Sequence, residues 1–191
     1  MKALILNGSR TADDPTNGVY EIILDELKEL GWNAQAFILR EEKIAYCLGC
    51  FGCWERTPGV CQIDDAGRVL AKALVNSNLV VFVTPVTFGG YSSELKKAVD
   101  RLIPTISPFF MKIDGEVHHK PRYKRYPRLM AVGVLPSRDE ESERLFTTLV
   151  GRNAINLHTP AHAADVVASD EGIEKARETV KALLAQVGVG R

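Results

Sequence analysis

The sequence predicts an α/β fold in which parallel strands form one sheet covered by helices on both faces. Two observations predict it. Short apolar runs alternate along the chain with segments of helical periodicity. The run 79–84 is continuously apolar, which is typical of a central strand buried on both faces. Helical segments between such strands favour right-handed parallel crossovers. Five strands and about five helices suit a doubly wound, five-stranded parallel sheet of flavodoxin-like type.

Each element has a local justification. The first strand, 3–6, is a short apolar run that ends at an Asn-Gly turn. The first helix, 19–30, carries apolar residues at helical spacing, and Gly31 follows it as a C-terminal signal. Asp64 or Asp65 is expected to cap the helix at 65–75. The remaining expected strands are 34–39, 79–84, 129–135 and one within 154–164, and the remaining expected helices are 92–102, 140–150 and 171–186.

Residues 104–127 interrupt this alternation. The segment holds four prolines, two histidines and a basic, aromatic stretch at 116–126. We expect a long loop inside one domain that spans residues 1–191, and a solvated lid or a subunit contact is the expected role of 116–126.

The composition excludes several classes. Of 191 residues, 46% are hydrophobic and 25% are charged, as in a soluble globular domain. Lys plus Arg and Asp plus Glu each number 24, and this balance argues against a nucleic-acid-binding protein. No apolar run approaches the about 20 residues of a membrane span, and the N-terminus does not resemble a signal peptide. We therefore expect a cytoplasmic protein with reduced thiols.

The loop after the first strand, 7–18, has the composition of a phosphate site. Its backbone N–H groups and hydroxyls precede the start of a helix, and both features favour an anion. Arg10 could add a bidentate contact. No Walker A or Gly-x-Gly-x-x-Gly pattern is present, and a merely polar connecting loop is the alternative. The candidate residues are Ser9, Arg10, Asn17 and Gly18.

The loop after the third strand, 84–93, should lie at the same sheet edge, where such sheets bind ligands. Its two glycines allow the backbone to approach a flat ligand closely. Phe88 or Tyr91 could contact the edge of a ring. The alternative is a glycine-rich turn without a ligand. The candidate residues are Pro85, Val86, Thr87, Phe88, Gly89 and Gly90.

All four cysteines fall within residues 47–61, spaced C-x2-C-x2-C-x7-C: Cys47, Cys50, Cys53 and Cys61. Three thiolates at successive x2 spacing are typical of an iron–sulfur cluster site. Zinc sites more often use two separated knuckles, so zinc is the second hypothesis. Free or reactive thiols are the third.

These motifs together resemble the NADPH-dependent FMN reductase-like flavoproteins and, within them, the iron–sulfur flavoproteins. The residues that carry the resemblance are Asn7-Gly8-Ser9-Arg10, the segment 84–90 followed by Ser93-Glu94-Leu95-Lys96, and the cysteine motif. The resemblance implies a flavodoxin-like fold, non-covalent FMN, a [4Fe-4S] cluster close to the flavin on the four cysteines, and a homodimer or homotetramer.

Together with the motifs, this resemblance implies an FMN-dependent oxidoreductase that passes electrons between FMN and a [4Fe-4S] cluster. Its electron donor and acceptor would be small molecules or proteins, with no nucleic acid or membrane as partner. The cofactors would carry the chemistry, so no side chain need act as a nucleophile. The alternatives are an NAD(P)H-dependent FMN or quinone reductase without a cluster, and a non-enzymatic flavin electron carrier.

Overall fold

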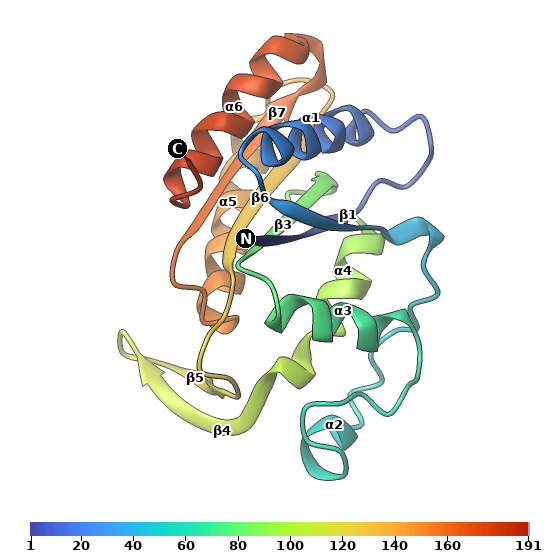
Figure 1. The fold of residues 1–191 in the computed structure, drawn as a ribbon, viewed down its shortest axis with the longest axis vertical. Helices are drawn as coiled ribbons and strands as arrows, with labels where there is room; N and C mark the ends of the chain where they lie inside the picture. Colours follow the sequence, from blue (N-terminus) through green and yellow to red (C-terminus); the bar gives the residue numbers. More distant parts are fainter. Residues whose placement is uncertain (191) are drawn as a thin grey trace.

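A computed structural model describes residues 1–190 and shows five parallel strands in one sheet, in the order β2–β1–β3–β6–β7 (Figure 1). This is the flavodoxin-like strand order, so the predicted fold class is confirmed. The strands are β1 (Lys2–Asn7), β2 (Asn33–Ile38), β3 (Leu79–Pro85), β6 (Arg128–Leu135) and β7 (His162–Ala168).

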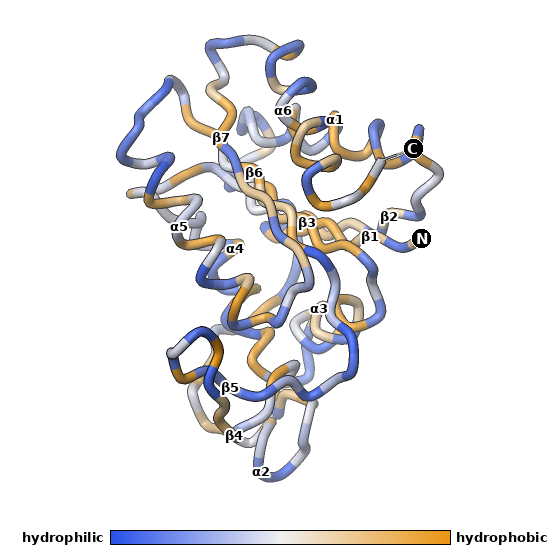
Figure 2. The backbone as a smooth tube through the Cα atoms, turned by 90° about the vertical axis from the view of Figure 1, so that its left-hand side faces the viewer, coloured by the Kyte–Doolittle hydropathy of each residue, from blue (hydrophilic) through white to orange (hydrophobic). Residues whose placement is uncertain are grey.

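Helices cover both faces of the sheet, as Figure 1 shows. The helices α1 (Thr16–Glu29) and α6 (Ile173–Gln186) pack on one face. The helices α3 (Ala66–Val75), α4 (Ser93–Asp100) and α5 (Glu140–Asn156) pack on the other. The central strands β1, β3 and β6, which run between these layers, are strongly hydrophobic (Figure 2). Successive residues of β3 alternate between the two cores, and Leu79 to Thr84 are fully buried.

Four short elements complete the connections: α2 (Gly52–Glu55), η1 (Leu39–Glu41), η2 (Ile103–Thr105) and η3 (Ser169–Glu171). Within residues 1–190, no helix is both long and apolar enough to cross a bilayer.

The expected long loop at 104–127 is wrong in its centre. It contains an antiparallel hairpin of β4 (Ile106–Ile113) and β5 (Glu116–Pro121), which lies beyond one end of the main sheet (Figure 1). Asp114 and Gly115, both with positive φ, form its two-residue turn. An Asp-Gly pair of this kind is a strong hairpin signal, because both turn positions need positive φ. Pro108 lies where the register of the pairing shifts, between Ile106 and Phe110, and Pro121 is the last residue of β5, so neither proline prevents the hairpin.

The last strand is shifted from its expected place. Helix α5 continues to Asn156, and β7 begins only at His162, so residues 154–164 hold mainly the end of a helix and a turn. His158, with a φ of 51°, takes the left-handed conformation that follows the helix. The first half of β7 consists of polar and small residues, which give a weak strand signal, and only its second half is apolar and buried.

The register of β1 and β3 brings their carboxyl ends level, since Asn7 pairs with Val83. The backbone N–H of Gly8 then donates to the Val83 carbonyl, at 2.8 Å. A Cβ atom at Gly8 would lie 2.8 Å from Ser92 Oγ and 2.9 Å from Leu95 Cβ. Only glycine fits here without displacing the start of α4.

We predict that Gly8→Ala destabilises the protein by about 1–3 kcal/mol, the usual cost of overpacking. The matched control is Gly18→Ala in helix α1, where an added Cβ meets no atom within 4 Å. That substitution should stabilise the helix by about 0.5–1 kcal/mol, because alanine is the better helix former. Urea unfolding of both variants measures the difference, and equal midpoints would contradict the close approach at Gly8.

Candidate functional site

The loop after β1 is braced by two asparagines. The buried Asn7 side chain accepts a hydrogen bond from the Ser9 N–H at 2.8 Å and donates to Asn17 Oδ1 at 3.1 Å. Asn17 in turn donates to the Thr11 and Ala12 carbonyls, at 3.2 and 3.0 Å. The Asn17 side chain, predicted to bind the cofactor, therefore shapes the loop from within.

Backbone N–H groups of this loop already converge on an anion. The two carboxylate oxygens of Asp14 accept from the N–H of Arg10 at 3.1 Å and of Thr16 at 2.9 Å. Thr16 Oγ1 is buried and has no hydrogen-bond partner among residues 1–190. The start of α1 thus has the chemistry of an anion site, and the Asp14 carboxylate accepts hydrogen bonds from two of its N–H groups.

Two arginines lie in or beside this loop. Arg10 is exposed, and its guanidinium forms no ion pair or hydrogen bond within the part of the chain that the structure describes. Arg40, from η1, is mostly buried and donates to the buried Ser9 hydroxyl at 2.5 Å. Sequence reasoning missed Arg40, because 31 residues separate it from Ser9 and no local pattern links them.

The loops after β1 and β3 meet directly. Ser92 Oγ donates to the Gly8 carbonyl at 2.6 Å and accepts from the Leu95 N–H at 3.2 Å, so it caps α4 while it holds the first loop. The Ser92 N–H donates to Thr84 Oγ1 at 3.0 Å. All these groups are buried. The structure therefore brings the two predicted loops together at one edge of the sheet.

A tight turn presents the tip of the second loop. Thr87 and Gly90 exchange two backbone hydrogen bonds, of 3.0 and 2.9 Å. Phe88 and Gly89 between them have φ angles of 51° and 71°, as in a type I′ turn. A phenylalanine in this conformation is strained, and its side chain is fully exposed. The turn thus holds an aromatic ring out in solvent beside the edge where the loops meet.

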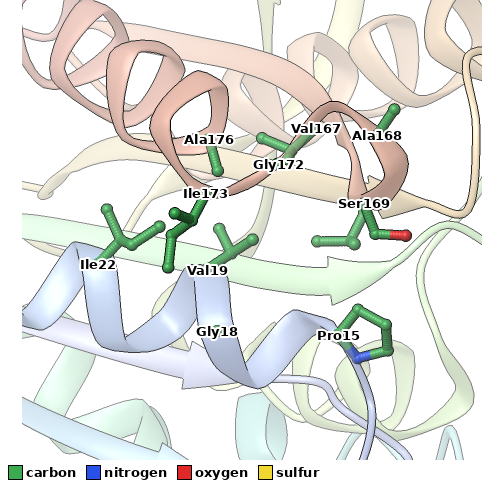
Figure 3. Close-up of a pocket in the computed structure, with 11 residues that line it drawn as sticks. Pro15, Gly18, Val19, Ile22, Val167, Ala168, Ser169, Gly172, Ile173 and Ala176 are labelled. Carbon is green, nitrogen blue, oxygen red and sulfur yellow. The ribbon is translucent and has the colours of Figure 1, made fainter.

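Two of the other predicted residues in these loops lie apart from that tip. Val86 is partly buried, and its N–H donates to the Val134 carbonyl at 2.9 Å. Gly18 lines an apolar cavity of about 170 Å³ between α1 and α6, together with residues such as Val19 and Ile173 (Figure 3). That cavity lies on the α1–α6 side of the sheet, so Gly18 is placed away from the second loop.

All four cysteines line one small pocket, which also contacts Arg101 and Pro104. Cys53 is buried, and burial together with the neighbouring thiols raises its pKa. Within residues 1–190, no group of three or more His, Cys, Asp or Glu side chains is arranged as a metal site. The thiols therefore share a pocket, but three or more of them do not converge on the position of a single metal ion.

The cysteine loop is supported by the hairpin. Trp54 of α2 donates its indole N–H to the Ile106 carbonyl at 3.0 Å. The ring of His119 lies between Trp54 and Phe110, with centroids 4.7 and 4.6 Å away. The β4–β5 hairpin thus packs against α2, the short helix that carries Cys53.

An ion pair closes the base of the cysteine loop. The fully buried Arg101 guanidinium contacts both oxygens of Asp65, at 2.8 and 2.7 Å. Asp65 also accepts from the N–H groups of Gly67 and Ala45, so it caps α3 as predicted and holds the start of the loop. Burial works to raise the pKa of Asp65, but the hydrogen bonds from Arg101, Ala45 and Gly67 outweigh it and lower the pKa.

We predict that Asp65→Asn lowers the free energy of unfolding by about 3–5 kcal/mol at pH 7, because it leaves the Arg101 charge buried without its partner. The folded pKa of Asp65 is depressed, so its stabilisation is present above the unfolded pKa of about 3.9 and is lost as the pH falls through the lower folded value. The difference in the free energy of unfolding between the variant and the wild type should therefore become smaller below about pH 4.

Urea unfolding across this pH range checks the prediction. Asp64→Asn is the control, since Asp64 is exposed and pairs with Arg68 only at the surface. A difference in unfolding free energy between Asp65→Asn and the wild type that is equal at pH 7 and pH 3 would contradict the assigned ion pair.

Comparison with known proteins identifies the family of this chain. Residues 1–139 match the NADPH-dependent FMN reductase family. An iron–sulfur flavoprotein from Archaeoglobus fulgidus is 35% identical over 102 residues, which are 53% of this chain and 48% of that protein. One from Methanocaldococcus jannaschii is 29% identical over 119 residues, 61% of each chain. The chain thus spans about half to three fifths of the length of these curated relatives.

Solved structures match over nearly the full length at low identity. An NAD(P)H:quinone oxidoreductase from Methanothermobacter marburgensis has a TM-score of 0.72 at 11% identity, covering 96% of this chain and 98% of that one. An FMN-dependent NADH-azoreductase from Bacillus anthracis, in complex with FMN, has a TM-score of 0.68 at 14% identity, covering 97% and 98%. These likenesses establish the shared fold. Because the family match extends over residues 1–139 of 191, the chain belongs to the NADPH-dependent FMN reductase family.

Proposed function

We propose that the chain is an FMN-dependent oxidoreductase whose flavin lies where the loops after β1 and β3 meet. The observation that carries this proposal is the buried contact between the Gly8 carbonyl and Ser92 Oγ. It joins an anion-binding loop to a loop with an exposed aromatic tip at the carboxyl edge of the sheet, where doubly wound sheets bind ligands. Family membership and the FMN-bound azoreductase neighbour support the choice of FMN.

The residues present fit a phosphate group. The N–H groups of Arg10 and Thr16 already bind a carboxylate, and the Thr16 hydroxyl is a buried group without a partner. Arg40 supplies a cation beside Ser9. In this proposal Ser9, Thr16 and Arg40 bind the phosphate. The phosphate also replaces the Asp14 carboxylate as the acceptor of the Arg10 and Thr16 N–H groups.

The second loop would position the ring. Residues 85–90 end β3 and form the tight turn, and backbone hydrogen bonds from Val86, Thr87 and Gly90 hold them in this conformation. When bound, FMN supplies the redox chemistry. The chain contributes binding, orientation and the exclusion of water, and the exposed Phe88 ring offers a face to an incoming electron donor or acceptor. In this proposal the electron donor is a nicotinamide, and the electron acceptor is a small molecule or a protein.

We predict that the purified protein releases FMN and no FAD on denaturation, and that Arg40→Ala weakens FMN binding about 10- to 150-fold. One charge-assisted hydrogen bond contributes about 1.5–3 kcal/mol, which corresponds to that range. Arg10→Ala, which removes an exposed cation of the same loop, should change the dissociation constant less. Fluorescence titration of the apoproteins with FMN measures both values. Arg40→Ala binding FMN as tightly as the wild type would remove Arg40 from the site.

We further propose that the four cysteines hold a [4Fe-4S] cluster. All four thiols line one pocket, and the donor set of four sulfurs is the one such clusters use. The names of the curated relatives support this choice. When bound, a cluster supplies one-electron chemistry. The chain's part is to supply the thiolates from the exposed loop 47–61 and to fix its two ends.

A reductase without a cluster is the second candidate. It is favoured by the spacing of the thiols, since no metal-binding group of three or more such side chains is formed within residues 1–190. In that case the chain would be an NAD(P)H-dependent FMN or quinone reductase, with the cysteines as free thiols.

Cys50→Ala separates the two candidates. After anaerobic reconstitution with iron and sulfide, the wild type should contain both elements and show an EPR signal when reduced, and Cys50→Ala should lose the signal. FMN binding should persist in the variant, because the flavin loops are separate from the cysteine loop. Leu48→Ala, an exposed neighbour in the same loop, is the control and should retain the cluster. Absence of iron and sulfide in the reconstituted wild type would favour the cluster-free reductase.

A further inference from the structure

Arg101 uses almost all of its hydrogen-bonding capacity on the cysteine loop. Its side chain is 0% exposed. Nη1 donates to Asp65 Oδ2 and to the Ala45 carbonyl, both at 2.8 Å. Nη2 donates to Asp65 Oδ1 at 2.7 Å and to the Ile63 carbonyl at 3.3 Å. A guanidinium has five N–H donors, so four are used by these contacts.

The fifth donor has no acceptor. Nε of Arg101 is buried and makes no hydrogen bond to any residue between 1 and 190. Leaving a buried donor unsatisfied costs about 1–3 kcal/mol, more for a charged group, and native structures rarely do so. This residue lines the pocket that the four cysteines share. The Cys61 side chain already lies within interaction distance of the Arg101 guanidinium, so sulfur in this pocket is the acceptor available to the free N–H group.

The other four donors fix the two ends of the loop. Ala45 lies two residues before Cys47, and Ile63 lies two residues after Cys61. Arg101 contacts both sides directly and through Asp65, whose carboxylate also accepts from the Ala45 N–H at 2.8 Å. The segment between these anchors is mostly exposed and contains left-handed residues at Gly49 and Phe51. Its cysteines can therefore adjust around a ligand while its ends stay in place.

We propose that Arg101 is the positioning residue of the cysteine site: it clamps both ends of the loop and donates its Nε–H to sulfur of the centre that the four cysteines hold. This inference rests on the [4Fe-4S] cluster proposed above. Hydrogen bonds to the sulfurs of a cluster help to set its reduction potential. The donor stabilises the reduced form more than the oxidised form, because reduction adds negative charge to the sulfurs.

The experiment compares Arg101→Lys with Arg68→Lys in the reconstituted protein. Lysine keeps the charge at 101 but cannot contact Asp65, both loop ends and a sulfur at once. Arg68 is the matched control: it also holds the loop, through the Cys61 and Gln62 carbonyls at 2.7 and 3.1 Å, but it does not line the cysteine pocket. Circular dichroism establishes that both variants are folded.

EPR-monitored redox titration then gives the decisive measurement. Arg101→Lys should shift the midpoint potential to a more negative value, and a tenfold change in the one-electron equilibrium constant corresponds to about 59 mV. Arg68→Lys should leave the potential unchanged. Equal potentials in wild type and Arg101→Lys, or an equal shift in both variants, would overturn the donor role of Arg101.

Hydrogen–deuterium exchange of the apoproteins tests the clamp independently of any cluster. Amides between 46 and 61 should exchange at least several-fold faster in Arg101→Lys than in wild type, and exchange in β3 should be unchanged. Equal exchange in the loop would overturn the clamp. If the wild type takes up no iron and sulfide, the cluster and the donor role fail together, and the clamp is still decided by exchange.

Discussion

The buried ion pair of Arg101 and Asp65 joins three parts of the chain at one point. Asp65 caps α3, Arg101 follows the last residue of α4, and together they hold both ends of the cysteine loop. A buried ion pair is weak evidence of added stability, since apolar residues of the same volume often do as well. Its geometry is the more informative property, because a bidentate guanidinium–carboxylate contact fixes direction as well as distance. The pair therefore determines where the loop begins and ends relative to the sheet.

The same reasoning applies at the sheet edge. Adjacent parallel strands deliver the loops after β1 and β3 to one place, but the side chains decide how close they come. Gly8 permits contact with Ser92, and Ser92 uses one hydroxyl to cap α4 and to hold the first loop. Had position 8 carried a Cβ atom, the start of α4 would have to move. A helix cap and a loop contact are thus a single structural feature.

Local patterns predicted much of this architecture. The continuous apolar run at 79–84, the cap at Asp65, and the alternation of strands and helices all depend on neighbouring residues, so sequence reveals them. The Asp114-Gly115 turn was also a local signal, but the surrounding prolines and basic residues obscured it. Arg40 and Arg101 could not be found this way. They reach Ser9 and Asp65 from 31 and 36 residues away, and only the folded chain brings them there.

Helix α4 places the two candidate sites at a fixed separation. Its N-cap is Ser92, which holds the loop after β1, and its C-cap is Arg101, which lines the cysteine pocket. Nine residue steps at about 1.5 Å each put these positions roughly 13 Å apart along the helix axis. The helix buries Leu95 and Ala98 against the core, so it is anchored along its length as well as at both ends. A ligand that moved the loops after β1 and β3 would therefore act on the cysteine pocket through a packed helix of defined length, and not through the exposed loop that carries the thiols.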